Sequence, residues 1–189
     1  MGAKNFCNSI TRILAEETVL IMEAMIYEYK NNYFIIQRST QGKKFDERIK
    51  ATEDVALYSK LLLNCSAEQL GKDALKALKN FNKIRPQWDP WELQILNKIF
   101  CSWVGARERK SFDRDSRCVQ IIKDKNIEII PFDNCVKNEW YGPMLNDMGF
   151  RNKIIILDIK SDCKIIGENI KKAFTRATYN PNRKTIDTN

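Results

Sequence analysis

The chain has 189 residues, of which 43% are apolar and 30% are charged. This balance is typical of a globular protein with a buried core, and it disfavours both a membrane protein and a long disordered chain. The 32 Lys and Arg residues exceed the 24 Asp and Glu residues, so the net charge is +8, and there is no histidine. Catalysis by Ser-His-Asp or Cys-His pairs and zinc binding through histidine are therefore excluded.

The first third of the chain is expected to be largely helical. Apolar residues recur near helical spacing over residues 9–30 and again over residues 44–63. Between them, residues 33–36 form a short apolar run that could be either a last helical turn or a strand. The pattern therefore predicts two N-terminal helices.

Two further helices are predicted from their starting signals. Ser66 and Gln69 have the spacing of a capping box, in which the two side chains satisfy free backbone N–H groups at a helix start. Asp89 followed by Pro90 indicates another helix start, and Gly105 is expected to end that helix. Residues 1–112 would thus contain about four helices.

The remainder of the chain shows mixed signals. Two β-branched runs, at residues 118–122 and 127–130, predict a hairpin, and residues 153–160 form the strongest predicted strand. Residues 134–148 are predicted to be helical in part, and a helix is predicted over residues 162–177. This part of the chain would therefore form a small three-stranded sheet with helices.

These elements together predict an α+β fold. A helical region, residues 1–112, would pack with a smaller region of strands and helices, residues 113–189, as one structural unit. The predicted linker between them, residues 107–117, is rich in charge and has no aliphatic side chain.

Basic side chains form two groups, one in the predicted linker and one on or beside the last predicted helix. Such groups can neutralise phosphates and release their counterions. We therefore expect a non-enzymatic protein that binds nucleic acid, RNA rather than DNA. The candidate binding residues are Arg107, Arg109, Lys110, Arg114, Arg117, Lys160, Lys164, Lys171, Lys172 and Arg176.

The last predicted strand and helix also carry a short motif. Residues 158–173 consist of a strand end at Asp158, a polar turn, and then a helix with Lys164, Gly167 and Ile170 near its start. This segment resembles the C-terminal anticodon-binding domain of class IIa aminoacyl-tRNA synthetases. The resemblance implies an RNA-binding fold and not aminoacylation, because no synthetase catalytic motif precedes the segment.

A Mg²⁺- or Mn²⁺-dependent nuclease is one alternative. Asp158 and Lys160 follow an apolar strand as an acidic-x-Lys triplet, which is similar to the metal-binding core of nucleases with a D…(D/E)-x-K signature. In such sites strand-borne carboxylates hold the metal, and the metal activates water. Asp133 would supply the other carboxylate, and Glu92 or Glu108 could complete the site. This alternative aside, no catalytic residue, metal site or cofactor is predicted.

The other alternative is a helical protein-interaction module, such as a viral factor that sequesters a host protein. Its contacts would be apolar, so an exposed tryptophan would favour it over nucleic-acid binding.

The longest uninterrupted apolar run is four residues, far from the ~18 that a membrane-spanning helix needs. We therefore expect an intracellular protein of the cytoplasm or nucleus that does not enter a membrane.

Overall fold

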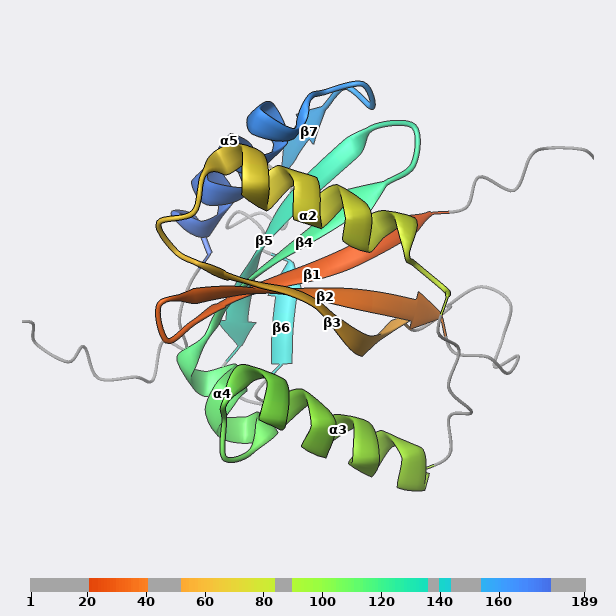
Figure 1. The fold of residues 1–189 in the computed structure, drawn as a ribbon, viewed down its shortest axis with the longest axis vertical. Helices are drawn as coiled ribbons and strands as arrows, with labels where there is room; N and C mark the ends of the chain where they lie inside the picture. The colour runs from red at the N-terminus through yellow and green to blue at the C-terminus, as the bar shows by residue number, and fades with distance from the viewer. Residues whose placement is uncertain (1–20, 41–51, 84–89, 136–139, 144–153, 178–189) are drawn as a thin grey trace, which may run out of the picture.

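The computed structural model describes residues 21–40, 52–83, 90–135, 140–143 and 154–177. In these residues an antiparallel sheet of seven strands is covered by two helices on each face (Figure 1). The strands are β1 (Met22–Tyr29), β2 (Asn32–Thr40), β3 (Thr52–Leu62), β4 (Arg117–Lys123), β5 (Ile127–Cys135), β6 (Trp140–Pro143) and β7 (Ile155–Leu157). The helices are α2 (Ala67–Lys79), α3 (Pro90–Val104), α4 (Arg109–Asp115) and α5 (Cys163–Phe174).

The strand order joins the two ends of the chain into one sheet. The order is β3-β2-β1-β4-β5-β6, and β7 also pairs with β5. The pairing of β1 with β4 therefore connects the N-terminal hairpin directly to the C-terminal one. The expected boundary near residue 112 falls inside α4.

No helix in the described residues is both long enough and apolar enough to cross a membrane.

The prediction of a helical N-terminal region is wrong, because β1, β2 and β3 occupy most of its described first part. β1 lies in the middle of the sheet, and all its residues from Ala24 to Tyr29 are buried. A strand that is buried on both faces lacks the alternation of apolar and polar residues, so its apolar residues matched a helical spacing by chance.

β3 was missed for a different reason. Its pairing with β2 shifts register at two places, between Ile35 and Ile36 and again between Gln37 and Arg38. Each irregularity breaks the period of two that identifies a strand in a sequence. The end of the helix predicted over residues 9–30 is instead a tight hairpin turn of two residues between β1 and β2. Lys30 and Asn31 have φ angles of 46° and 61°, as a two-residue turn of type I′ requires.

Several other predictions are confirmed. Ser66 caps α2 by accepting a hydrogen bond from the backbone N–H of Gln69, at 3.1 Å. α3 begins at Pro90 and is followed by Gly105, whose φ is 68°. β4 and β5 form the predicted hairpin, and α5 occupies the predicted last helix.

The described part of residues 134–148 forms the end of β5 and all of β6, so the partial helix predicted there is wrong, as is a sheet of three strands. Other predicted features lie outside the described residues, namely those at residues 9–20, 41–51, 84–89, 136–139, 144–153 and 178–189.

Each face of the sheet has its own apolar core. The core under α2 and α5 is aliphatic, with Ile26, Ile35, Leu70, Ile121, Ile129, Ile166 and Ile170 fully buried. The core under α3 and α4 is aromatic, and its buried members include Tyr27, Tyr29, Phe34, Phe100, Phe112 and Phe132. Alternate residues of β1 point to opposite cores, as the pleat of a strand requires.

α2 and α5 touch backbone to backbone through two glycines. A Cβ atom on Gly71 would lie 1.9 Å from the carbonyl oxygen of Cys163, and one on Gly167 would lie 1.8 Å from that of Ala67. Real Cβ atoms do not approach other atoms so closely, so only glycine allows this contact. Gly167, which belongs to the motif quoted above, therefore has a packing role.

We expect Gly167→Ala to lower the free energy of unfolding by about 2–3 kcal/mol, because the two helices must separate. This sign is opposite to that of helix propensity, which favours alanine over glycine by ~1 kcal/mol. Urea denaturation measures the change, with exposed Glu168→Ala on the same helix as the control. Unchanged or increased stability of Gly167→Ala would show that the contact is not tight.

Candidate functional site

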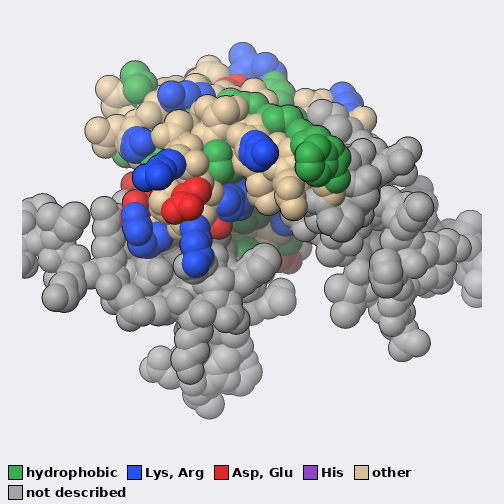
Figure 2. All heavy atoms as spheres, turned by 90° about the horizontal axis from the view of Figure 1, so that it is seen from below, with side chains coloured by type: hydrophobic (Ala, Val, Ile, Leu, Met, Phe, Trp, Pro, Cys, Tyr) green, Lys and Arg blue, Asp and Glu red, His purple; other side chains and the backbone are tan. Residues whose placement is uncertain are grey.

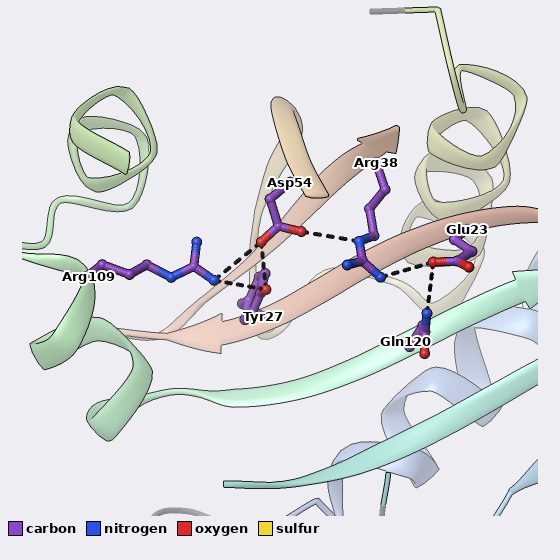
Figure 3. A network of polar contacts seen from close by, with 6 residues as sticks. All are labelled: Glu23, Tyr27, Arg38, Asp54, Arg109 and Gln120. Atoms are coloured by element: carbon purple, nitrogen blue, oxygen red, sulfur yellow. Dashed lines mark hydrogen bonds and ion pairs between the residues drawn. The ribbon is translucent and has the colours of Figure 1, made fainter. Parts of the chain in front are cut away.

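A network of polar side chains crosses the sheet on the face that carries α3 and α4 (Figure 3). It contains side chains from four strands and from α4, and these residues are distant from one another in sequence. Its members are Glu23 and Tyr27 of β1, Arg38 of β2, Asp54 of β3, Gln120 of β4 and Arg109 of α4.

One end of the network is centred on Arg38. Its Nη1 donates to Glu23 Oε2 at 2.9 Å, and its Nε lies 3.5 Å from Asp54 Oδ1. Gln120 Nε2 donates to the same Glu23 oxygen at 3.0 Å. The exposed fractions of the Arg38 and Asp54 side chains are 16% and 9%. Each charge therefore offsets the free-energy cost of burying the other.

The other end of the network is centred on Asp54. Tyr27 donates its hydroxyl hydrogen to Asp54 Oδ2 at 2.7 Å, and Arg109 Nη2 lies 3.3 Å from the same oxygen. Arg109 Nε also donates to Asp113 Oδ1 at 2.9 Å. The Arg109 guanidinium lies 4.0 Å from the centre of the Phe100 ring, a cation–π contact.

These surroundings fix the protonation states at the centre of the network. Burial raises the pKa of Tyr27 well above 10, and the neighbouring Asp54 raises it further. Burial alone would lower the pKa of Arg109, but Tyr27, Asp54 and Asp113 outweigh this effect and hold the pKa above its ordinary value. Tyr27 is therefore a neutral donor and Arg109 a cation at neutral pH.

Acidic and basic groups alternate along the network, and the ion pairs of Arg38 with Glu23, Arg38 with Asp54 and Arg109 with Asp54 each join a different pair of elements. The described residues contain no group of three His, Cys, Asp or Glu side chains that could hold a metal ion. The network therefore acts as a charge-compensated connection between the sheet and α4.

The basic residues predicted to bind nucleic acid lie on two faces. Arg107, Lys110 and Arg114 are exposed at or near α4, on one face of the sheet. Lys164 and Lys172 are exposed on α5, which packs on the opposite face. The structure thus separates the two groups and does not join them into one surface.

Three of the linker arginines have acidic partners. Besides the Arg109 contacts described above, Arg114 pairs with Asp115 at 3.0 Å and Arg117 pairs with Glu28 at 2.6 Å. Arg117 also donates to the carbonyl oxygen of Phe174 at 3.0 Å. Arg109 and Arg117 connect elements of the fold, whereas Arg114 pairs within α4, and less of the charge of all three is available to a polyanion.

The predicted residues near α5 are more varied. Lys171 donates to the carbonyl oxygen of Cys65 at 2.5 Å, and Arg176 is half-buried after the helix. Lys160, in the turn before α5, is exposed like Lys164 and Lys172. Exposed Glu168 lies one turn from each of these two helix lysines and places a negative charge between them.

The structure does not bring the predicted nuclease residues together. Ile127 at the start of β5 pairs with Leu157, the residue before Asp158, whereas Asp133 pairs with Gly142 near the far end of β5. Six residues of strand separate the two positions, a distance of roughly 20 Å. The Asp158 carboxylate accepts a hydrogen bond from its own turn, from the N–H of Lys160 at 2.7 Å.

Sequence reasoning missed Glu23, Arg38 and Asp54, because Glu23 and Asp54 lay in segments predicted to be helices and Arg38 lay between those segments. The spacing of Glu23 and Tyr27, with Met25 between them, was the available signal, since alternate residues of a strand share a face. The structure also leaves 68% of the Trp91 side chain exposed, and an exposed tryptophan is the feature expected of a protein-interaction module.

Comparison with known proteins shows the fold. Neither a family model nor the sequence of a curated protein matches the chain, so the resemblance to anticodon-binding domains stays a prediction. A protein of unknown function from Neisseria meningitidis, NMB0488, is 19% identical, with 85% of this chain and 97% of that chain covered and a TM-score of 0.60.

A second similar structure is a CdiA-CT/CdiI toxin and immunity complex from Yersinia pseudotuberculosis. One of its chains is 14% identical, with 84% of this chain and 98% of that chain covered and a TM-score of 0.63. In both comparisons the coverage extends over nearly the whole of the other chain. At these identities the likeness establishes a shared fold.

We expect Asp54→Asn to lower the free energy of unfolding by about 3 kcal/mol, because Arg38 and Arg109 would both lose their shared carboxylate. Exposed Glu168→Gln, an equivalent change on α5, should leave stability within ~0.5 kcal/mol of the wild type. Chemical denaturation of both variants measures the difference. Equal stabilities would mean that the network does not hold α4 on the sheet.

Proposed function

We propose that the protein functions by binding another protein, as one member of a toxin–immunity pair, and that it is the member that neutralises its partner. The observation that carries this proposal is the fold shared with a chain of a toxin and immunity complex, over 98% of that chain. Because the match covers 84% of this chain and 98% of that one, a surface that recognises a protein partner would be carried by the same framework in both.

The neutralising role is favoured over the toxic one by the chemistry of the chain. The absence of histidine excludes the commonest general base of toxic hydrolases. The carboxylates Asp133 and Asp158, which a metal-dependent nuclease would need side by side, lie toward opposite ends of β5: Asp133 is near its end, and Asp158 follows the β7 residue that pairs with its start. A protein that blocks its partner needs only a complementary surface, which this fold can supply.

Nucleic-acid binding is the second candidate function, with RNA as the preferred target. The exposed lysines at and near the start of α5, Lys160 and Lys164, favour it. The acidic partners of Arg109, Arg114 and Arg117 count against it, as does the separation of the two basic groups. We therefore place it after protein binding.

The test is to purify the tagged protein from its native cells and treat the material with nuclease. We expect one protein to remain bound in equal amount after nuclease treatment, and a complex of the two purified chains to elute as one species from size-exclusion chromatography. Expressed alone, the partner should slow bacterial growth, and co-expression of this protein should restore it.

Other results would contradict the proposal. If nucleic acid alone copurifies, and its affinity falls steeply with salt, the second candidate is correct. If expression of this protein by itself stops growth, it is the toxic member of a pair and not the neutralising one.

A further inference from the structure

α3 has two apolar faces. Its inner face, with Phe100 and Val104 buried and Trp103 packed beside them, closes the aromatic core. Its outer face carries Trp91, Ile95 and Ile99, each separated by four residues. A helix in a globular protein normally has one apolar stripe and a polar outer face, so the second stripe is not explained by the fold of this chain.

The outer stripe is exposed along its whole length. The exposed fractions are 68% for Trp91, 41% for Ile95 and 39% for Ile99. Residues spaced by four lie one above the other on a helix, so the three side chains form a continuous strip about 12 Å long. Exposed apolar strips of this kind are typical of surfaces that another protein covers.

The charge beside the strip is positive. From Trp91 to Asp115 the chain has five basic and four acidic residues. Two of the acids, Asp113 and Asp115, are bound to Arg109 and Arg114. Among the described side chains of this segment Glu108 is the one exposed carboxylate, whereas Lys98, Arg107 and Lys110 are exposed cations.

The apolar and basic groups lie on the same side of the molecule. Figure 2 views the molecule from the side of α3 and α4. Apolar side chains gather toward one end of this face, and Lys and Arg side chains, with Asp and Glu side chains between them, gather toward the other. Lys98 is next to Ile99 on α3, the helix that carries the apolar strip. The two ends therefore form one surface that is apolar and cationic at once.

We propose that this surface is the docking site for the protein partner, and that the partner presents an acidic segment with apolar side chains. The proposal rests on the proposed function and specifies the surface and the partner's chemistry. The apolar side chains of the partner would cover Trp91, Ile95 and Ile99. Its carboxylates would pair with Lys98 and Arg107 at the edge of the contact, where opposite charges guide association.

The fold provides a matched control for this surface. Ile165 on α5 is 42% exposed, nearly the same as Ile95 on α3, but it lies on the opposite face of the sheet. The two positions differ in location and not in residue type or exposure. Any effect that is specific to position 95 therefore reports on the α3–α4 face.

The first experiment is photo-crosslinking of the full chain in its native cells. It compares two variants, Ile95→p-benzoylphenylalanine and Ile165→p-benzoylphenylalanine. We expect position 95 alone to crosslink to the protein that copurifies with the wild type, through a peptide that contains several Asp or Glu residues. Crosslinking of that protein from position 165 alone would overturn the docking site while leaving the proposed function intact.

Two other occupants of the strip would also overturn the proposal. One is a second copy of this chain, which would give a crosslinked dimer, and the other is a distant segment of the same chain, which would give an internal crosslink. If the wild type copurifies with no protein at all, the proposed function fails, and the docking site fails with it.

The second experiment uses the complex reconstituted from the purified chain and the crosslinked protein. We expect Ile95→Ala to weaken binding at least tenfold at both low and high salt, and Ile165→Ala to leave it unchanged. Lys98→Glu combined with Arg107→Glu should weaken binding at least tenfold at low salt and much less at high salt.

All of these side chains are exposed, so the variants should keep the thermal midpoint of the wild type, and a lower midpoint would identify a variant that misfolds. Equal affinities for Ile95→Ala and Ile165→Ala, with unchanged midpoints, would contradict the proposal.

Discussion

The burial of β1 on both faces is the constraint on which the rest of the structure depends. As the strand of the N-terminal hairpin that pairs with the C-terminal hairpin, it must contribute one set of side chains to the aliphatic core and the other set to the aromatic core. It also carries two glutamates, Glu23 and Glu28, which enter the sheet with it. A buried carboxylate is costly unless it is paired, and each of them has an arginine partner, Arg38 and Arg117 respectively.

On the two faces of the sheet, the helices are therefore held in place by different interactions. On one face, α2 and α5 meet through Gly71 and Gly167 and lie on an aliphatic core, so the packing is close and leaves no room for a side chain. On the other face, α4 is connected to the strands through Arg109, which combines ion pairs with aromatic contacts. The position of the α3–α4 face thus depends on a polar network whose members come from four strands.

How much of this could be predicted from the sequence depended on whether the signal was local. α2 and α5 have their caps within three residues, Ser66 with Gln69 and Asp162 with Ile165, and both helices were predicted. β1 gave no local signal, because its burial depends on β2 and β4, and β4 is about 90 residues away in the sequence. The prediction of the fold class was wrong because β1 was predicted to be helical, although the C-terminal hairpin and the last helix were predicted correctly.

The same distinction applies to the candidate site. The basic residues of the predicted linker were visible as a cluster, but the carboxylates that pair with two of them, Asp54 and Glu28, belong to strands that lie far away in the sequence. A cluster of arginines is equally consistent with phosphate binding and with a set of internal ion pairs, and only the three-dimensional pairing separates the two.

The charged part of the surface proposed for the partner consists of side chains that the ion pairs described above do not include. Ion pairs within the fold neutralise Arg109 and Arg117, whereas Lys98 and Arg107 lie on exposed parts of the chain beside an apolar strip. Apolar contacts mainly set how long a complex persists, while charges at the rim mainly set how fast it forms. A chain with a net charge of +8 would attract an acidic partner from a distance, and the strip on α3 would then hold it in place. On this view the basic composition and the exposed tryptophan, which favoured different functions when the sequence was considered alone, contribute to a single recognition surface.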